Sequence, residues 1–159
     1  MKRPIVKSGL IVKIPLSEGY HTYARILDKK DFAFYKIKTK TEVTLDEIIA
    51  SEIIFTGIVE LWAITKLRWE VLGYRELESN IQNWPKYFIP DIVDRENYRI
   101  FEQGGIRDFN VTKEECNGLE YGIVWSPEGM EERINDFFEG RQNEHINFLN
   151  KFYYAPPES

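Results

Sequence analysis

The sequence predicts an α+β protein that is mostly β, with a curled antiparallel sheet that could approach a barrel and two C-terminal helices packed on it. Three observations favour this fold. Apolar residues alternate in the first forty positions, later runs are rich in β-branched and aromatic residues, and strong helix-start signals follow residue 125. The 159 residues match one domain, with mainly sheet in residues 1–125 and helix in residues 126–154.

The stretch from residue 9 to residue 37 predicts a three-stranded meander around which the remaining chain is organised. Its first strand places four apolar side chains on one parity, namely Leu10, Val12, Ile14 and Leu16. The polar runs SEGY and DKKD have turn chemistry, and they separate this strand from residues 20–28 and 32–37. Three strands with one apolar face are enough to nucleate a core.

The middle of the chain predicts a short helix and then a buried strand. Thr44 and Glu47 have the spacing of a capping box, so we expect a helix to begin at Thr44 and end near Ser51. Both parities of residues 53–65 are mostly apolar. We predict a central strand there, because many of these residues are β-branched and Gly57 would cost a helix about 1 kcal/mol.

The later elements are shorter. Strands are expected at residues 69–77, 98–102 and 121–125, and one helical turn is expected at residues 112–117. Pro85 and Pro90 predict an irregular segment over residues 78–90, in which Trp84, Tyr87 and Phe88 cover one end of the sheet. Gly104 and Gly105 should close the strand at 98–102.

Two helices are predicted at the C-terminal end. Ser126, Pro127 and Glu128 form a favourable helix start, and Gly140 is expected to end that helix. A second helix is expected from Asn143, and it should bury Ile146, Leu149 and Phe152.

Composition argues against several classes of protein. Cys116 is the single cysteine, and His21 and His145 are isolated, so we expect no disulfide, metal site or cofactor. The sequence shows no nucleotide-binding glycine loop and no recognised catalytic motif, so we do not expect an enzyme. It also has no signal-peptide pattern and no apolar run long enough to span a bilayer, so we expect a cytoplasmic protein.

Charge is divided unevenly along the chain. Residues 1–40 carry ten basic and three acidic side chains, a net charge of +7, whereas residues 41–159 carry a net charge of −12. The densest acidic region lies between residues 114 and 136. As a partner-binding surface we therefore predict Glu114, Glu115, Glu120, Trp125, Glu128, Glu131, Glu132 and Asp136, with Trp125 as an apolar anchor. The simpler alternative is a solvated helix face.

Two other functions compete with a protein-binding role. Basic and aromatic residues in the first forty positions could form a nucleic-acid-binding β module that uses Lys13, Arg25, Lys36 and Lys38. The acidic remainder of the chain argues against it. A hydrolase would have to use Cys116 and His145, a pairing that the sequence supports only weakly. His21, Tyr23 and Arg25 share one strand parity and could bind an anion or line a polar sheet face.

Several stretches resemble one protein family. The order GLIVKIPL, YHTYARIL, FAFYKI and IIFTGIVELWAITKLRWEVLGYREL, followed by a loop containing Tyr87 and Phe88, is similar to the immunity protein 26 family of bacterial toxin systems. The resemblance covers roughly residues 9–103. It implies a cytoplasmic, largely β immunity protein that binds and blocks a cognate toxin, often a nuclease. It supplies no catalytic residues.

Overall fold

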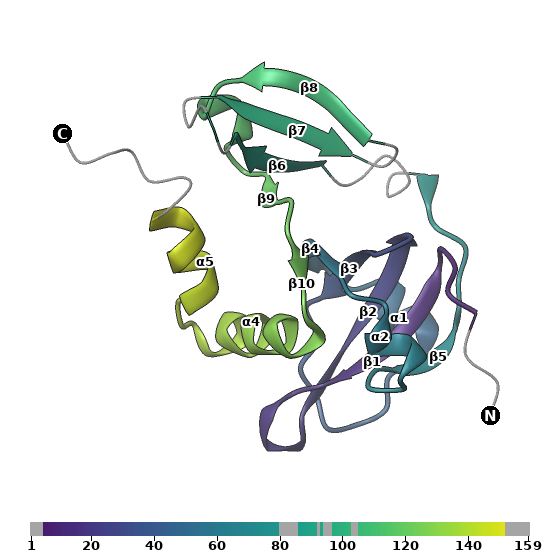
Figure 1. The fold of residues 1–159 in the computed structure, drawn as a ribbon. Coiled ribbons are helices and arrows are strands. Elements are labelled where there is room, and N and C mark those ends of the chain that lie inside the picture. The colour runs from purple at the N-terminus through teal and green to yellow at the C-terminus, as the bar shows by residue number, and fades with distance from the viewer. Residues whose placement is uncertain (1–4, 80–85, 92, 94–96, 103–104, 152–159) are drawn as a thin grey trace.

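The computed structural model describes residues 5–79, 86–91, 93, 97–102 and 105–151, with backbone alone described for residues 105–110. These residues form two β-sheets and four α-helices (Figure 1). The larger sheet has six strands in the order β10-β4-β3-β2-β1-β5, and the smaller has four in the order β8-β7-β6-β9. The predicted mixed fold with more strand than helix is confirmed. The strands divide between two sheets, however, and neither sheet closes into a barrel.

The predicted meander is confirmed as the centre of the larger sheet. It consists of β1 (Leu10–Pro15), β2 (His21–Asp28) and β3 (Asp31–Tyr35), which pair in antiparallel order. The short 3-10 helix η1 (Ser17–Gly19) forms the first turn. Alternate side chains face two separate cores: Val12 and Phe32 belong to one, and Ile11 and Tyr35 to the other. Both faces of the meander are therefore covered.

The prediction of a strand over residues 53–65 is correct only for the first half of this segment. β4 (Ile53–Val59) pairs with β3, and the chain then forms helix α2 (Trp62–Thr65) before β5 (Glu70–Tyr74). Because β3 begins at Asp31, it offers no backbone to pair with residues beyond Val59. The chain instead satisfies its own amides, with the Lys66 amide donating to the Trp62 carbonyl at 2.9 Å.

The predicted helix starts are confirmed by their capping hydrogen bonds. The side-chain oxygens of Thr44, Ser126 and Asn143 each accept a bond from the backbone amide three residues later, at 3.2, 3.0 and 3.0 Å. The helices that follow are α1 (Leu45–Ile49), α4 (Pro127–Glu139) and α5 (Glu144–Leu149). Gly140 ends α4 in the left-handed conformation, as predicted.

The smaller sheet contains two strands that the sequence did not indicate. It is formed by β6 (Lys86–Pro90), β7 (Tyr98–Glu102), β8 (Gly105–Val111) and the short β9 (Glu120–Tyr121). The prediction of irregular chain over residues 78–90 is wrong at β6, where Pro90 takes the last position of the strand and costs little pairing. Gly105, which was predicted only to end the strand at residues 98–102, is the first residue of β8. Trp84, Pro85 and Gly104 lie outside the described residues.

The segment predicted as one strand at residues 121–125 is instead two short strands that join the two sheets. β9 pairs in parallel with β6, and β10 (Val124–Trp125) pairs in parallel with β4. Gly122 lies between them. A Cβ atom at this position would lie 2.1 Å from the Phe101 ring, so the close approach requires glycine. The predicted turn at residues 112–117 is confirmed as the 3-10 helix η2 (Glu114–Cys116).

The C-terminal helices pack on different sheets rather than on one. Met130 and Ile134 of α4 belong to the core of the larger sheet, and Leu149 of α5 belongs to the core of the smaller sheet. Ile123 and Ile146 pack against both cores. The segment from β9 to α5 therefore fixes how the two sheets sit together (Figure 1). Phe152, predicted to be buried, lies outside the described residues.

Candidate functional site

The outward face of α4 carries two of the predicted acidic residues in an exposed position. Glu128 and Glu132 are exposed, whereas Met130 and Ile134 on the opposite side of the helix are buried. Glu128 has an ion-pair contact of 3.6 Å with Arg68, which partly neutralises one end of the face. We call Glu128 and Glu132 the α4 acidic face.

Glu131 does not share this exposed position, which corrects the expectation that it lies on the outer face. Its side chain is 12% exposed, and its carboxylate accepts two bonds from the Arg68 guanidinium, at 2.7 and 2.9 Å. The indole nitrogen of the buried Trp69 donates to the same carboxylate at 2.9 Å. Glu131 thus connects α4 to the core.

Glu120, Asp136 and Trp125 are also engaged within the protein. Glu120 accepts a bond from Arg133 at 2.8 Å, and Asp136 pairs with Arg141 at 3.2 Å near the end of α4. Trp125 is 4% exposed, so it presents almost no surface to a partner. Among the described residues after Trp125, Phe137 and Phe148 are exposed aromatic side chains, at 42% and 50% exposure.

The remaining acidic residues lie elsewhere. Glu114 and Glu115 are exposed on η2, which lies beside the smaller sheet, whereas α4 runs along the larger one (Figure 1). The structure therefore separates the eight predicted residues into two exposed pairs and four residues held by internal contacts. Their closeness in the sequence does not produce one surface.

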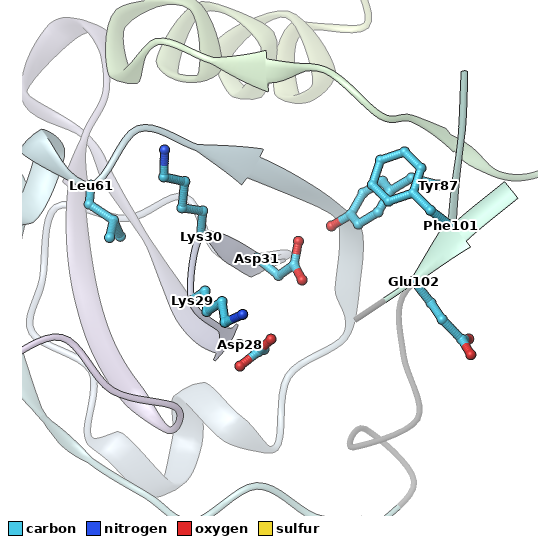
Figure 2. A pocket seen from close by; sticks show the side chains of 8 residues that line it. All are labelled: Asp28, Lys29, Lys30, Asp31, Leu61, Tyr87, Phe101 and Glu102. Carbon is cyan, nitrogen blue, oxygen red and sulfur yellow. The ribbon is translucent and has the colours of Figure 1, made fainter. Parts of the chain in front are cut away.

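A pocket of about 450 Å³ opens where the β2–β3 turn faces the smaller sheet (Figure 2). We call it the inter-sheet pocket. Its lining combines three carboxylates, two lysines and an apolar wall: Asp28, Asp31, Glu102, Lys29, Lys30, Leu61, Tyr87 and Phe101. In the sequence, Asp31 belongs to the predicted turn DKKD, and Tyr87 belongs to the segment predicted to cover one end of the sheet. No local pattern indicates that they meet, because 56 positions separate them.

Asp31 and Tyr87 have unusual environments in this pocket. Burial is the main cause that raises the pKa of the Asp31 carboxyl to about 6; the neighbouring Asp28 acts in the same direction, while the Tyr87 hydroxyl and Lys29 oppose the shift. Burial and the charge of Asp31 also raise the pKa of the Tyr87 hydroxyl. Figure 2 shows the hydroxyl of Tyr87 and the carboxylate of Asp31 pointing toward one another.

We expect Asp31→Asn to change how stability depends on pH. The pKa of Asp31 is raised on folding, from about 3.8 to about 6, so the native state favours the protonated carboxyl. This contribution is complete below about pH 4 and is lost as the pH rises through about 6. After discounting for solvent screening, the loss is about 1–2 kcal/mol, so Asp31→Asn should be more stable than the natural chain by that amount at pH 8.

Urea denaturation of both chains at pH 4, 6 and 8 measures this effect. The quantity to follow is the difference in unfolding free energy between the variant and the natural chain, because other carboxylates affect both alike. Asp46→Asn, at a side chain that is 79% exposed, is the control for removing one surface carboxylate. A stability difference for Asp31→Asn that stays constant from pH 4 to pH 8 would contradict the raised pKa.

The residues proposed for nucleic-acid binding do not form a free basic surface. Arg25 is fully buried, where its guanidinium binds Glu78 at 2.8 and 3.1 Å and the carbonyl of Arg75 at 2.7 Å, with a further bond to the carbonyl of Glu76. This corrects its assignment as a contact to phosphate or to another anion. Lys36 lies 3.8 Å from Glu52.

Lys13 and Lys38 lie toward the end of the meander that is away from the inter-sheet pocket, near η1. Lys13 lines a second pocket of about 320 Å³ with His21 and Arg68, and burial and Lys13 together lower the pKa of His21. Lys38 lies 4.7 Å from the centre of the Tyr20 ring, and Lys40 lies 4.6 Å from it. Tyr20 is therefore already engaged by two cations, which argues against base stacking on its ring.

The hydrolase candidates do not come together. Cys116 is 1% exposed within the core of the smaller sheet, and burial raises the pKa of its thiol to about 11, so the thiolate is disfavoured. His145 is exposed on α5 and packs edge-on against Trp125 at 4.9 Å. No hydrogen bond joins the described atoms of Cys116 to His145.

Neither a cluster of metal-ligating side chains nor a membrane-spanning helix occurs among the described residues. No group of three or more histidine, cysteine, aspartate or glutamate side chains among them could hold a metal ion. None of the helices in the described part of the chain is long and apolar enough to cross a membrane.

The fold and the candidate surfaces define a mixed α/β protein with paired sheets, charged exposed faces and an acidic pocket between its sheets. A family model described as "Immunity protein 26" matches residues 7–99, which is more than half of the chain. The chain belongs to this family, as the resemblance in its sequence implied. No curated protein and no solved structure matches it.

Proposed function

We propose that this chain is a cytoplasmic immunity protein that binds a cognate bacterial toxin and neutralises it. The observation that carries the proposal is the family match over residues 7–99. Residues 7–99 contain the whole meander and most of the larger sheet, so the match covers the part of the fold that organises the remainder. Binding, rather than catalysis, is the role that the family description favours.

We further propose that the toxin is a nuclease and that an acidic surface covers its active site. Nucleases bind phosphates through cationic clefts, and carboxylates on an inhibitor accelerate the encounter with such a cleft. The α4 acidic face, Glu128 and Glu132, is the first candidate for this surface, and the exposed pair Glu114 and Glu115 on η2 is the second. Charge supplies rate rather than tightness, so an apolar anchor is needed as well. Phe137 and Phe148 replace Trp125 in that role, because Trp125 is buried.

Co-expression with a neighbouring toxin gene tests the function as a whole. A large, multidomain toxin gene with a variable C-terminal domain should lie directly upstream, and this chain should restore growth to cells that express that domain. Persistent toxicity, despite soluble expression of this chain, would refute the proposed function.

Charge reversal tests the proposed surface. We expect the double variant Glu128→Lys with Glu132→Lys to slow association with the toxin domain by about tenfold or more at low salt, because attractive steering becomes repulsive. Stopped-flow fluorescence at two salt concentrations measures the rate, and the effect should shrink as salt screens the charges.

The matched control is Glu42→Lys with Glu47→Lys, which changes the net charge equally at two exposed positions, one just before α1 and one within it. An equal slowing by both double variants would show that net charge, rather than the α4 acidic face, controls the encounter. The η2 pair, Glu114 and Glu115, would then be tested next.

A further inference from the structure

The inter-sheet pocket contains a buried polar group that the protein leaves unsatisfied. Tyr87 is 1% exposed, and its hydroxyl oxygen is buried without a hydrogen-bond partner. That hydroxyl points into the pocket toward Asp31 (Figure 2). An unpaired buried hydroxyl is costly, so one that faces a pocket calls for an explanation, and a bound group that accepts or donates there is one.

The charge of the Asp31 carboxylate is also not neutralised by an ion pair within the described residues. No ion pair to Asp31 is formed by the described residues, and the nearest strand neighbour across the β2–β3 pair is another carboxylate, Asp28. Lys30 is directed away from Asp31 and lies 3.4 Å from Glu60 instead (Figure 2). Lys29, held in a left-handed turn at φ 48°, is the remaining cation of the lining. Asp28 and Asp31 together therefore carry more negative charge than Lys29 alone neutralises.

The opposite wall of the pocket is aromatic. The rings of Tyr87 and Phe101 lie 5.5 Å apart and are tilted by 33°, and Gly122 allows the Phe101 ring to approach the β9–β10 connection closely. Leu61 completes the apolar lining. A carboxylate facing aromatic rings is the arrangement that binds a flat cation, because one partner supplies charge and the other supplies a stacking surface.

We propose that the inter-sheet pocket receives an arginine side chain from a protein partner. Its guanidinium would donate to the Asp31 carboxylate and the Tyr87 hydroxyl, and its plane would lie against the ring of Phe101, which is less buried than Tyr87. The identification of that partner as the toxin rests on the proposed function, whereas the chemistry of the pocket does not.

Arginine fits the pocket better than other occupants. The carboxylates repel phosphates and other anions, and an uncharged apolar ligand would leave Asp31 and Tyr87 unsatisfied. A lysine ammonium supplies charge but not a planar fork with several donors, whereas a guanidinium can reach both oxygen groups while stacking. The volume of about 450 Å³ is ample for one extended side chain.

A small probe tests the pocket without any toxin. N-acetyl-arginine amide is titrated into the full chain at pH 7.5 and low salt, with backbone amide and carboxyl NMR signals as the readout. We expect saturable shifts at Asp31, Tyr87 and Phe101, with a Kd on the order of millimolar for so small a ligand. N-acetyl-citrulline amide, a neutral molecule of nearly the same shape, should give no saturable shift.

Variants then assign the contacts. Asp31→Asn should weaken binding of the probe by about tenfold or more, and Tyr87→Phe by about threefold, while Asp46→Asn should leave it unchanged. Bound probe should also lower the pKa of Asp31 in the natural chain, because a nearby cation favours the carboxylate. Tyr87→Phe keeps the test decisive if Asp31→Asn fails to fold.

Several results would overturn the proposal. These are an absence of saturation by the arginine probe, equal binding of the citrulline probe, and unchanged binding in both Asp31→Asn and Tyr87→Phe. Toxin experiments separate the two proposals. If the probe binds but the chain fails to neutralise the toxin, the proposed function fails alone. If Asp31→Asn binds and neutralises the toxin as tightly as the natural chain, the toxin does not use the pocket.

Discussion

Replacing Arg25 with alanine should lower the free energy of unfolding by about 3–5 kcal/mol, the largest single effect expected in this protein. Arg25 is fully buried, and its guanidinium holds the carboxylate of Glu78 together with two carbonyls from the chain that leaves β5. Its removal leaves those carbonyls unsatisfied and opens a cavity in the core beneath α1. The variant therefore loses both packing and the attachment of the segment that leads toward the smaller sheet.

The matched control is an ion pair between a basic residue and a glutamate that lies at the surface, Lys36 with Glu52. Lys36 and Glu52 lie 3.8 Å apart with side chains 56% and 72% exposed, so Lys36→Ala should cost at most about 1 kcal/mol. Urea denaturation midpoints measure both variants. Arg25→Lys should lie between them, because it keeps the charge and loses the planar fork. A loss below about 1 kcal/mol for Arg25→Ala would contradict the structural role of this buried arginine.

Replacing Glu131 with alanine should cost about 2–3 kcal/mol, the second largest effect. The carboxylate of Glu131 is the hydrogen-bond acceptor for the Trp69 indole and a two-bond partner for Arg68. Trp69 lies edge-on to Phe32 at 5.5 Å in the core of the larger sheet. Loss of the bond from its indole nitrogen to Glu131 therefore destabilises the packing of this core. Thermal unfolding measures the stability, and the indole N–H signal of Trp69 in an NMR spectrum reports the environment of this ring.

Glu132 gives a control on the same helix turn. It is exposed, and Glu132→Ala should change the stability by no more than about 0.5 kcal/mol. Similar effects of the two substitutions would show that Glu131 behaves as a surface residue. The comparison also matters for partner studies, because a charge reversal that included Glu131 would damage the fold and confuse the measurement of binding.

The structure of the acidic region from residue 114 to residue 136 was only partly predictable from the sequence. The pattern correctly indicated that α4 has an apolar side and a charged side, because helical periodicity is a local property. It could not show that Glu131 and Glu120 face Arg68 and Arg133, since these contacts depend on how helix and sheets pack. Nor could it show that η2 and α4 lie on different sheets (Figure 1).

The sequence by itself determined the elements whose causes are local. Alternating apolar residues define the meander, and the capping side chains of Thr44, Ser126 and Asn143 define the starts of α1, α4 and α5, because these patterns require only a few neighbouring residues. The family resemblance rested on the same strands and was confirmed over residues 7–99.

Only the tertiary structure decided where the strands pair and which charged groups are buried. β4 stops where its partner β3 begins, and the chain from β9 to β10 passes from one sheet to the other, neither of which periodicity encodes. Arg25 alternates with apolar neighbours like a surface residue, yet α1 and the chain after β5 cover it. Asp31 and Tyr87 meet because the two sheets are packed together, and a contact between residues so distant in the sequence arises from the whole fold rather than from any local pattern.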